Sequence, residues 1–96
     1  MAENVETSDA FYTQYPFPNH PSHIVGARNF AKRFLKHWNT PCKNLLVLGC
    51  GTGEEVKGLS EGLPKIASIC AVEPCEASYS IAKDLLVSDP CSNVHQ

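Results

Sequence analysis

The chain has 96 residues, of which 43% are hydrophobic and 19% are charged, and its formal net charge is −2. That length suits one small domain rather than two, and the composition excludes collagen-like and wholly disordered classes. Because the chain is so close to neutral, its charge gives no strong signal for binding nucleic acid or an anionic membrane surface.

No apolar stretch approaches the ~18 residues that would span a bilayer, and the chain does not begin with a basic region followed by an apolar one. We therefore expect no membrane partner and a cytoplasmic location. The five cysteines include no C-x-x-C pair. With no export signal in the sequence, we expect free thiols.

The first 23 residues are expected to lie outside the folded domain. Residues 1–10 are polar and acidic and are predicted to form a flexible tail. Residues 11–23 hold three prolines and four aromatic residues, which predicts a stiff, extended segment. Two roles are open for this segment: a strap that lays its rings on a core, or a lid or arm that contacts a substrate.

Residues 24–96 alternate helices with strands. Apolar positions three and four residues apart predict a helix over residues 24–38. The apolar run at residues 44–48 predicts a strand buried on both faces, and residues 66–72 predict a second strand. A helix follows each strand, and residues 93–96 resemble the beginning of a third strand. This order indicates an α/β fold, a Rossmann-like parallel sheet with flanking helices, truncated at its third strand.

A glycine-rich turn joins the first predicted strand to its helix. It reads Gly49-Cys50-Gly51-Thr52-Gly53 and is followed by Glu54 and Glu55. Glycine permits positive φ and lets a ligand approach the backbone closely, and the N–H groups at the start of a helix can face that ligand. Thr52 and Glu55 also have the spacing of a capping box.

Three kinds of glycine turn were compared with this one. A P-loop requires a lysine directly after its last glycine, but the nearest match, Gly53 to Gly58, is followed by Leu59. A dinucleotide-binding G-x-G-x-x-G motif would need its third glycine at Glu54 or at Val56, and acids are unfavourable where a pyrophosphate would lie. The G-x-G-x-G spacing suits a phosphate-free ligand with some positive charge. A tight strand-to-helix turn that binds nothing is the alternative.

Residues 47–53 closely resemble the glycine-rich motif of class I S-adenosylmethionine-dependent methyltransferases. The family also carries an acidic residue at the end of the second strand, which binds the ribose hydroxyls, and Glu73 stands at that place. The resemblance implies S-adenosylmethionine as cofactor. The cofactor-binding residues that it implies are Gly49, Cys50, Gly51, Thr52, Gly53, Glu73 and Pro74.

Two departures from the family pattern affect the prediction. Many members have an acidic residue two positions before the first glycine, where this chain has Val47. The anchor for the cofactor's amino-acid end must then come from elsewhere, and Glu54 and the segment at residues 12–17 are candidates. The family's sheet also has seven strands, whereas this sequence ends as its third strand begins.

The expected function is therefore S-adenosylmethionine-dependent methyl transfer to an unidentified substrate. We expect the chain to be a truncated methyltransferase, in which residues 24–96 form the N-terminal part of the cofactor-binding domain. The alternative is a catalytically inactive fragment or an accessory module that needs a partner chain to complete its sheet. No catalytic residue can be named.

The remaining candidate residues give weaker signals. His20 and His23 form an H-x-x-H pair without further ligands at a zinc-like spacing, so no metal site is predicted. The thiol of Cys50 lies near a helix N-terminus, where a thiol pKa can fall, but we expect it to pack rather than react. Cys70 is predicted to lie in the core.

Overall fold

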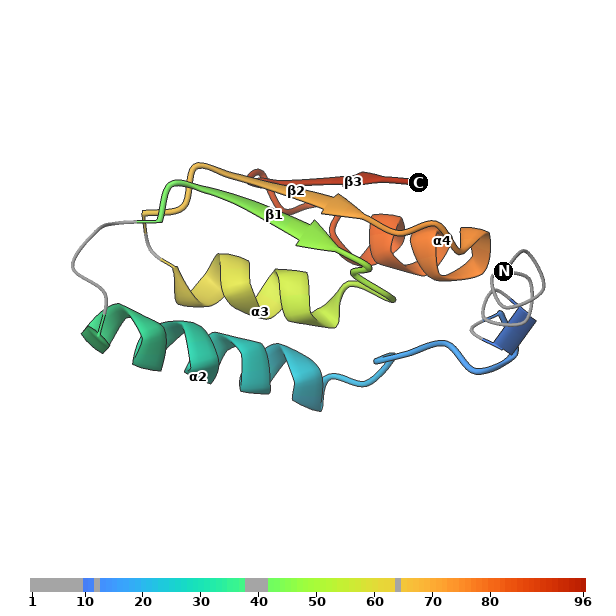
Figure 1. Ribbon diagram of the computed structural model, residues 1–96, viewed down its shortest axis with the longest axis horizontal. Helices are drawn as coiled ribbons and strands as arrows, with labels where there is room; N and C mark the ends of the chain where they lie inside the picture. The colour runs from blue at the N-terminus through green and yellow to red at the C-terminus, as the bar shows by residue number, and fades with distance from the viewer. Residues whose placement is uncertain (1–9, 12, 38–41, 64) are drawn as a thin grey trace.

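The computed structural model describes residues 10–11, 13–37, 42–63 and 65–96. Helices and strands alternate along the chain, as the sequence predicts (Figure 1). The elements are α2 (Ser22–His37), β1 (Asn44–Leu48), α3 (Glu54–Gly62), β2 (Ser68–Val72), α4 (Glu76–Leu85) and β3 (Ser92–His95).

The three strands form one parallel sheet in the order β1-β2-β3. Leu46 lies opposite Cys70, and Cys70 lies opposite Asn93. The expected α/β class and the expected third strand are thus confirmed. Because the strands are parallel, the chain leaves all of them at one edge of the sheet, where the glycine turn also lies (Figure 1).

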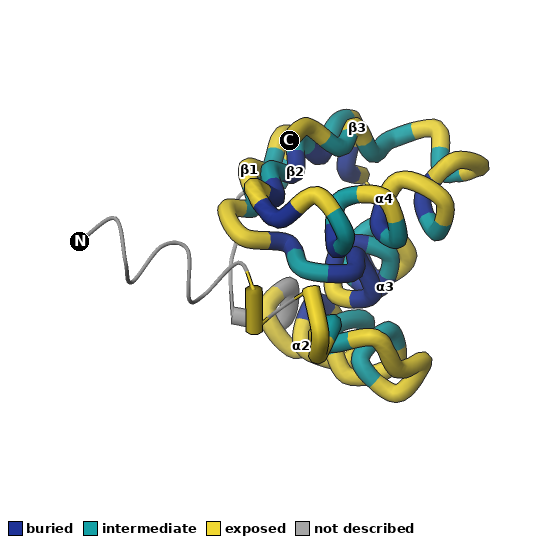
Figure 2. The backbone as a smooth tube through the Cα atoms, turned by 90° about the vertical axis from the view of Figure 1, so that its right-hand side faces the viewer, coloured by how far each residue is buried: buried dark blue, intermediate teal, exposed yellow. Residues whose placement is uncertain are grey.

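The molecule has three layers: the sheet, then α3 and α4 on one of its faces, then α2 on the far side of α3 (Figure 2). Among the described residues, no helix covers the other face of the sheet. Leu46 and Leu48 on that face are 60% and 74% exposed, and Cys70 is only partly buried. The predictions of a first strand buried on both faces and of a core position for Cys70 are therefore wrong. A continuous apolar run does not reveal whether a second layer of helices covers the sheet.

The hydrophobic core fills the space between the sheet and the helices α3 and α4. Ile69 and Ala71 contribute to it from β2, Val56 from α3 and Ala82 from α4, and all four are fully buried. The alternate residues of β1, Leu45 and Val47, pack against this core from its edge. Full burial of an isoleucine or valine side chain contributes about 1.5–3 kcal/mol, so Ile69 and Val56 contribute most among these four residues to the contact between the sheet and α3.

Helices α2 and α3 approach each other closely because two glycines of α3 face two alanines of α2. A Cβ placed on Gly58 would lie 2.7 Å from the Cβ of Ala27, and one on Gly62 would lie 2.7 Å from the Cβ of Ala31. Residues four apart share one helix face, so the glycine pair forms a flat surface for the alanine pair. This contact fixes α2, and the segment that precedes it, against the element that carries the glycine turn.

The N-terminal region differs from its prediction in two respects. Residues 10, 11, 13 and 14 are helical, and the N–H of Tyr15 donates to the Phe11 carbonyl across 2.7 Å. The helical residues end at Gln14, because the ring of Pro16 disfavours a helical conformation at Tyr15, and residues 15–21 form bends and a turn rather than the predicted extended segment. Helix α2 also begins two residues earlier than predicted, at Ser22. Of the predicted tail at residues 1–10, only Ala10 is described, and it is helical. Residues 1–9 lie outside the described residues, as does Trp38, the predicted last residue of the helix.

Within the described part of the chain, no helix is both long enough and apolar enough to cross a membrane.

Candidate cofactor-binding site

The glycine turn follows β1 and uses the conformational freedom of all three glycines. Gly49, Gly51 and Gly53 have φ values of 71°, 59° and 93°, a region that side chains other than glycine's disfavour. The N–H groups of Gly49 and Cys50 both donate to the carbonyl of Val72, across 2.8 and 3.2 Å. These two hydrogen bonds hold the turn against the end of β2.

The structure brings Glu73, at the end of β2, directly onto this turn. The N–H of Gly51 donates to Oε1 of Glu73 across 2.8 Å, and the N–H of Cys75 donates to Oε2 across 2.9 Å. The side chain is only 8% exposed. Each carboxylate oxygen can accept a second hydrogen bond, so the fixed carboxylate can receive two hydroxyl groups from a ligand on the turn. Pro74 is exposed beside it and does not open α4, which begins at Glu76 after an N-cap at Cys75.

Thr52 is fully buried and connects three parts of the site. Its hydroxyl donates to Oε1 of Glu54 and accepts a hydrogen bond of 2.6 Å from the N–H of Asn19. The predicted capping box is therefore wrong. The N-cap of α3 is Gly53 without any side-chain hydrogen bond, and Glu55 is exposed. The Thr52 hydroxyl does not cap the helix because its hydrogen bonds with Glu54 and Asn19 already use it.

An irregular segment, which we call the N-terminal strap (residues 15–21), contacts the glycine turn. The carbonyl of Phe17 accepts a 3.1 Å hydrogen bond from the N–H of Thr52, and a Cβ on Gly51 would lie 3.0 Å from Cδ of Pro18. The strap thus contacts the turn through its backbone and Pro18, whereas the rings of Tyr15 and Phe17 are more than half exposed. The prediction that the aromatic rings of this segment pack on a core is therefore wrong for Tyr15 and Phe17. A role as lid or substrate-contacting arm stays a prediction.

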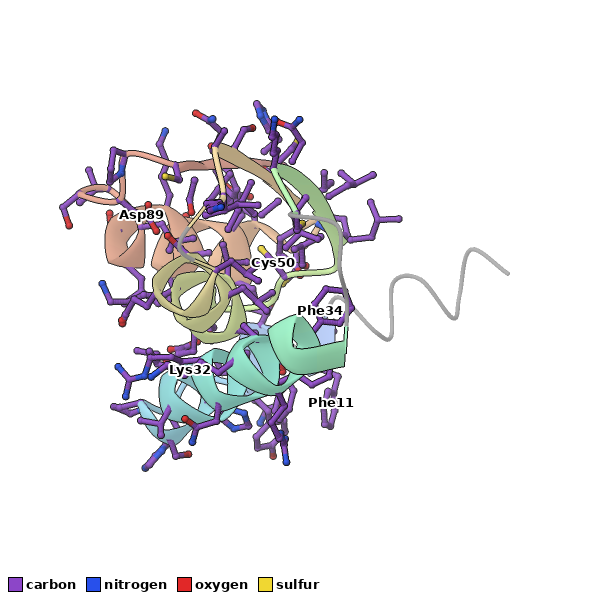
Figure 3. The ribbon with its side chains drawn as sticks, turned by 90° about the vertical axis from the view of Figure 1, so that its left-hand side faces the viewer. Phe11, Lys32, Phe34, Cys50 and Asp89 are labelled. Atoms are coloured by element: carbon purple, nitrogen blue, oxygen red, sulfur yellow. The ribbon has the colours of Figure 1, made fainter. Side chains whose placement is uncertain are left out.

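The thiol of Cys50 lies in the interior, between the sheet and α3 (Figure 3). Burial and the negative charge of Glu73 raise the pKa of this thiol from 9.0 to about 11. The pKa of this thiol is thus raised, although the thiol lies near a helix N-terminus. Cys50 is therefore a packing residue at the base of the turn, as the sequence suggested.

Two buried carboxylates, those of Glu54 and Glu73, flank the turn. Among the described residues, the one ion pair lies elsewhere, between Arg28 and Glu61 at 3.8 Å. Neither buried carboxylate therefore has a lysine or arginine partner in this part of the chain. An unpaired buried carboxylate is costly and disfavours a phosphate at this place. A cationic ligand would relieve that cost.

Sequence reasoning missed one participant in this site, Asn19. The residue has a positive φ of 42° and reaches Thr52 across 33 positions of sequence. The prolines at positions 16, 18 and 21 around Asn19 were a signal for an ordered turn, but they did not indicate its partner. His20 bonds to the hydroxyl of Ser22 at 2.8 Å. No group of three metal-ligating side chains occurs in the described part of the chain.

Comparison with known proteins found similarity in structure rather than in sequence. No family model matches the chain, and no curated protein matches it by sequence. Several solved structures, however, match the chain. The sugar N-methyltransferase KedS8 from Streptoalloteichus sp ATCC 53650 is 26% identical with a TM-score of 0.56, over 76% of this chain and 27% of KedS8.

Two further structures match almost the whole chain. The plantazolicin methyltransferase BpumL, in complex with a monoazolic desmethylPZN analogue and SAH, has a TM-score of 0.59 at 16% identity. DesVI of Streptomyces venezuelae has a TM-score of 0.60 at 18% identity. Both alignments cover 97% of this chain, but only 34% of BpumL and 35% of DesVI.

The fold is therefore the Rossmann-like, N-terminal portion of the S-adenosylmethionine-dependent methyltransferase fold, and the structural resemblance expected from residues 47–53 and Glu73 is confirmed. The chain spans about a third or less of the length of the structures that it matches.

Proposed function

We propose that the chain binds S-adenosylmethionine on its glycine turn, as the cofactor-binding part of a methyltransferase whose methyl acceptor is unidentified. The observation that carries this proposal is the hydrogen bond between the N–H of Gly51 and Oε1 of Glu73. It places a fixed, buried carboxylate on a turn whose three glycines all have positive φ, and a Cβ on Gly49 would meet nothing within 4 Å.

The chemistry of the residues agrees with that of the cofactor. Oxygen atoms of Glu73 would accept the two ribose hydroxyl protons. The sulfonium is cationic and the cofactor has no phosphate, which suits a turn flanked by two unpaired carboxylates. The related structure of BpumL holds SAH. When bound, the cofactor supplies an activated methyl group, and the residues of this chain contribute binding and orientation.

The proposal can be tested by titrating S-adenosylhomocysteine into the chain by calorimetry and comparing the Glu73→Gln variant. Hydrogen bonds to a charged group contribute about 1.5–3 kcal/mol, so we expect the dissociation constant to rise about 10–100-fold. The matched control is Glu76→Gln, which removes an exposed acid three residues away and should leave the affinity unchanged. Equal affinities of wild type and Glu73→Gln would remove Glu73 from the site.

A second candidate function is supported by the open sheet face. Leu46 and Leu48 lie on β1, a strand whose outer edge has no partner among the described residues, and both are strongly exposed. An apolar edge strand is a template for pairing with another chain. On this alternative the chain is an accessory module whose β1 pairs with a strand of a partner protein, and the Discussion gives the test.

A further inference from the structure

The first residue of α3, Glu54, is buried in a way that its position does not require. It is 7% exposed, whereas the adjacent Glu55 is exposed. Both carboxylates lie in the first turn of the helix, where the dipole favours negative charge. Because Glu55 gains that benefit while remaining in water, the dipole does not explain why Glu54 is buried.

Hydrogen bonding satisfies only one side of the Glu54 carboxylate. Oε1 accepts the hydroxyl proton of Thr52, while Oε2 accepts no hydrogen bond from any described residue. No fully buried side-chain oxygen in the described part of the chain lacks a partner, so Oε2 is partly accessible to solvent. Glu54 neither caps α3 nor pairs with a lysine or arginine of the described residues.

The two buried carboxylates are attached to adjacent residues of the turn. Gly51 holds Glu73 through its N–H, and Thr52 holds Glu54 through its hydroxyl. A ligand that lies along the turn can therefore meet one carboxylate at each end. If Glu73 takes the ribose, the open oxygen of Glu54 is available for a positively charged group at the opposite end of the ligand. Val47, the alternative place for an acid, is apolar and packs against the core.

We infer that Oε2 of Glu54 binds the α-ammonium group at the amino-acid end of S-adenosylmethionine. This inference rests on the proposed function and adds to it the residue that recognises the ligand's cationic end. The Thr52 hydroxyl, held in place by the N–H of Asn19, orients the carboxylate. Thr52 and Asn19 are thus positioning residues for Glu54.

The test is a cycle of two ligands and three proteins, measured by calorimetry. The ligands are S-adenosylhomocysteine and its desamino analogue, in which hydrogen replaces the amino group. The proteins are the wild type, Glu54→Gln and the matched control Glu55→Gln. We expect the wild type to prefer the amino ligand about 10–100-fold, as a charge-assisted hydrogen bond would give. This preference should fall nearly to one in Glu54→Gln and stay unchanged in Glu55→Gln.

A third ligand, 5′-deoxy-5′-methylthioadenosine, separates this inference from the proposed function, because it keeps the nucleoside and lacks the amino-acid end. Its affinity should be the same for wild type and Glu54→Gln. If Glu54→Gln weakens all three ligands equally, Glu54 only supports the turn and the inference is overturned. If the wild type binds methylthioadenosine but does not distinguish the amino ligand from the desamino one, the inference is also overturned while the proposed function stands. If the wild type binds none of the three, both are wrong.

Discussion

The carbonyl of Phe17 occupies the space that a side chain on Gly51 would need. A Cβ on Gly51 would overlap with that carbonyl and would lie 3.0 Å from Cδ of Pro18. Gly49, two residues earlier, also has a positive φ, but a Cβ there would meet nothing within 4 Å. Both glycines thus adopt a positive φ, but only Gly51 also packs against the N-terminal strap.

This difference predicts unequal effects of two alanine variants. Gly49→Ala should lower the free energy of unfolding by about 1–2 kcal/mol, because the left-handed conformation is unfavourable for alanine. Gly51→Ala has the same backbone cost and in addition must displace the strap, so its loss of stability should be larger. Chemical denaturation of both variants measures the difference.

Hydrogen exchange gives a second readout of the same contact. In Gly51→Ala the amide protons of Thr52 and Asn19, which bond across the strap contact, should exchange faster than in the wild type and in Gly49→Ala. Equal exchange of these two amides in both variants would mean that the strap does not depend on Gly51.

The order of elements could be predicted because each carries a local signal. The bounds of β1 are those of its apolar run, and the turn that follows has a glycine at every second position, all three with positive φ. The pairing of Glu73 with this turn could also be expected, because parallel strands end at the same edge of a sheet. These features depend on residues that are close together in sequence or on the geometry of parallel sheets.

The contacts of Thr52 could not be predicted in the same way. Asn19 uses its backbone N–H to reach the Thr52 hydroxyl, and every residue except proline has such a donor, so no residue type indicates the pair. The spacing of Thr52 and Glu55 matched a local capping motif, but the tertiary contact determined the outcome. The buried state of Glu54 was missed for a similar reason, since an acid in the first turn of a helix is usually solvated.

The raised pKa of the Cys50 thiol predicts a pH dependence of stability. Burial, together with the charge of Glu73, raises the folded-state pKa from 9.0 to about 11. Between these two values the unfolded chain loses the thiol proton while the folded chain keeps it. The stability associated with the neutral thiol is therefore fully present below pH 9.0 and is lost as the pH rises toward 11.

Denaturation curves of the wild type and of Cys50→Ala across this pH range provide the measurement. Other groups titrate there too, but they are common to both proteins, so the difference between the two slopes reports on Cys50. We expect the free energy of unfolding to fall more steeply with pH in the wild type. Identical slopes would mean that the thiol ionises equally easily in the folded and unfolded chains.

The open face of β1 leads to the last prediction, which tests the second candidate function. Leu48 is 74% exposed on a strand whose outer edge has no partner among the described residues. At high protein concentration such a strand should pair with that of a second copy, because the unpaired N–H and C=O groups of an edge strand form a template for another strand. Leu48→Lys should suppress this association, since a lysine on an edge strand opposes pairing, without reducing stability, since its side chain lies in solvent.

Val87 provides a matched control for this experiment, because it is an even more exposed apolar residue, at 82%, in the turn after α4 and away from β1. Sedimentation velocity over a range of concentrations should show association of the wild type and of Val87→Lys, and a monomer for Leu48→Lys. If all three proteins associate equally, β1 is not the contact surface. If the wild type remains a monomer at every concentration, the exposed apolar edge does not drive pairing, and the case for an accessory module loses its structural support.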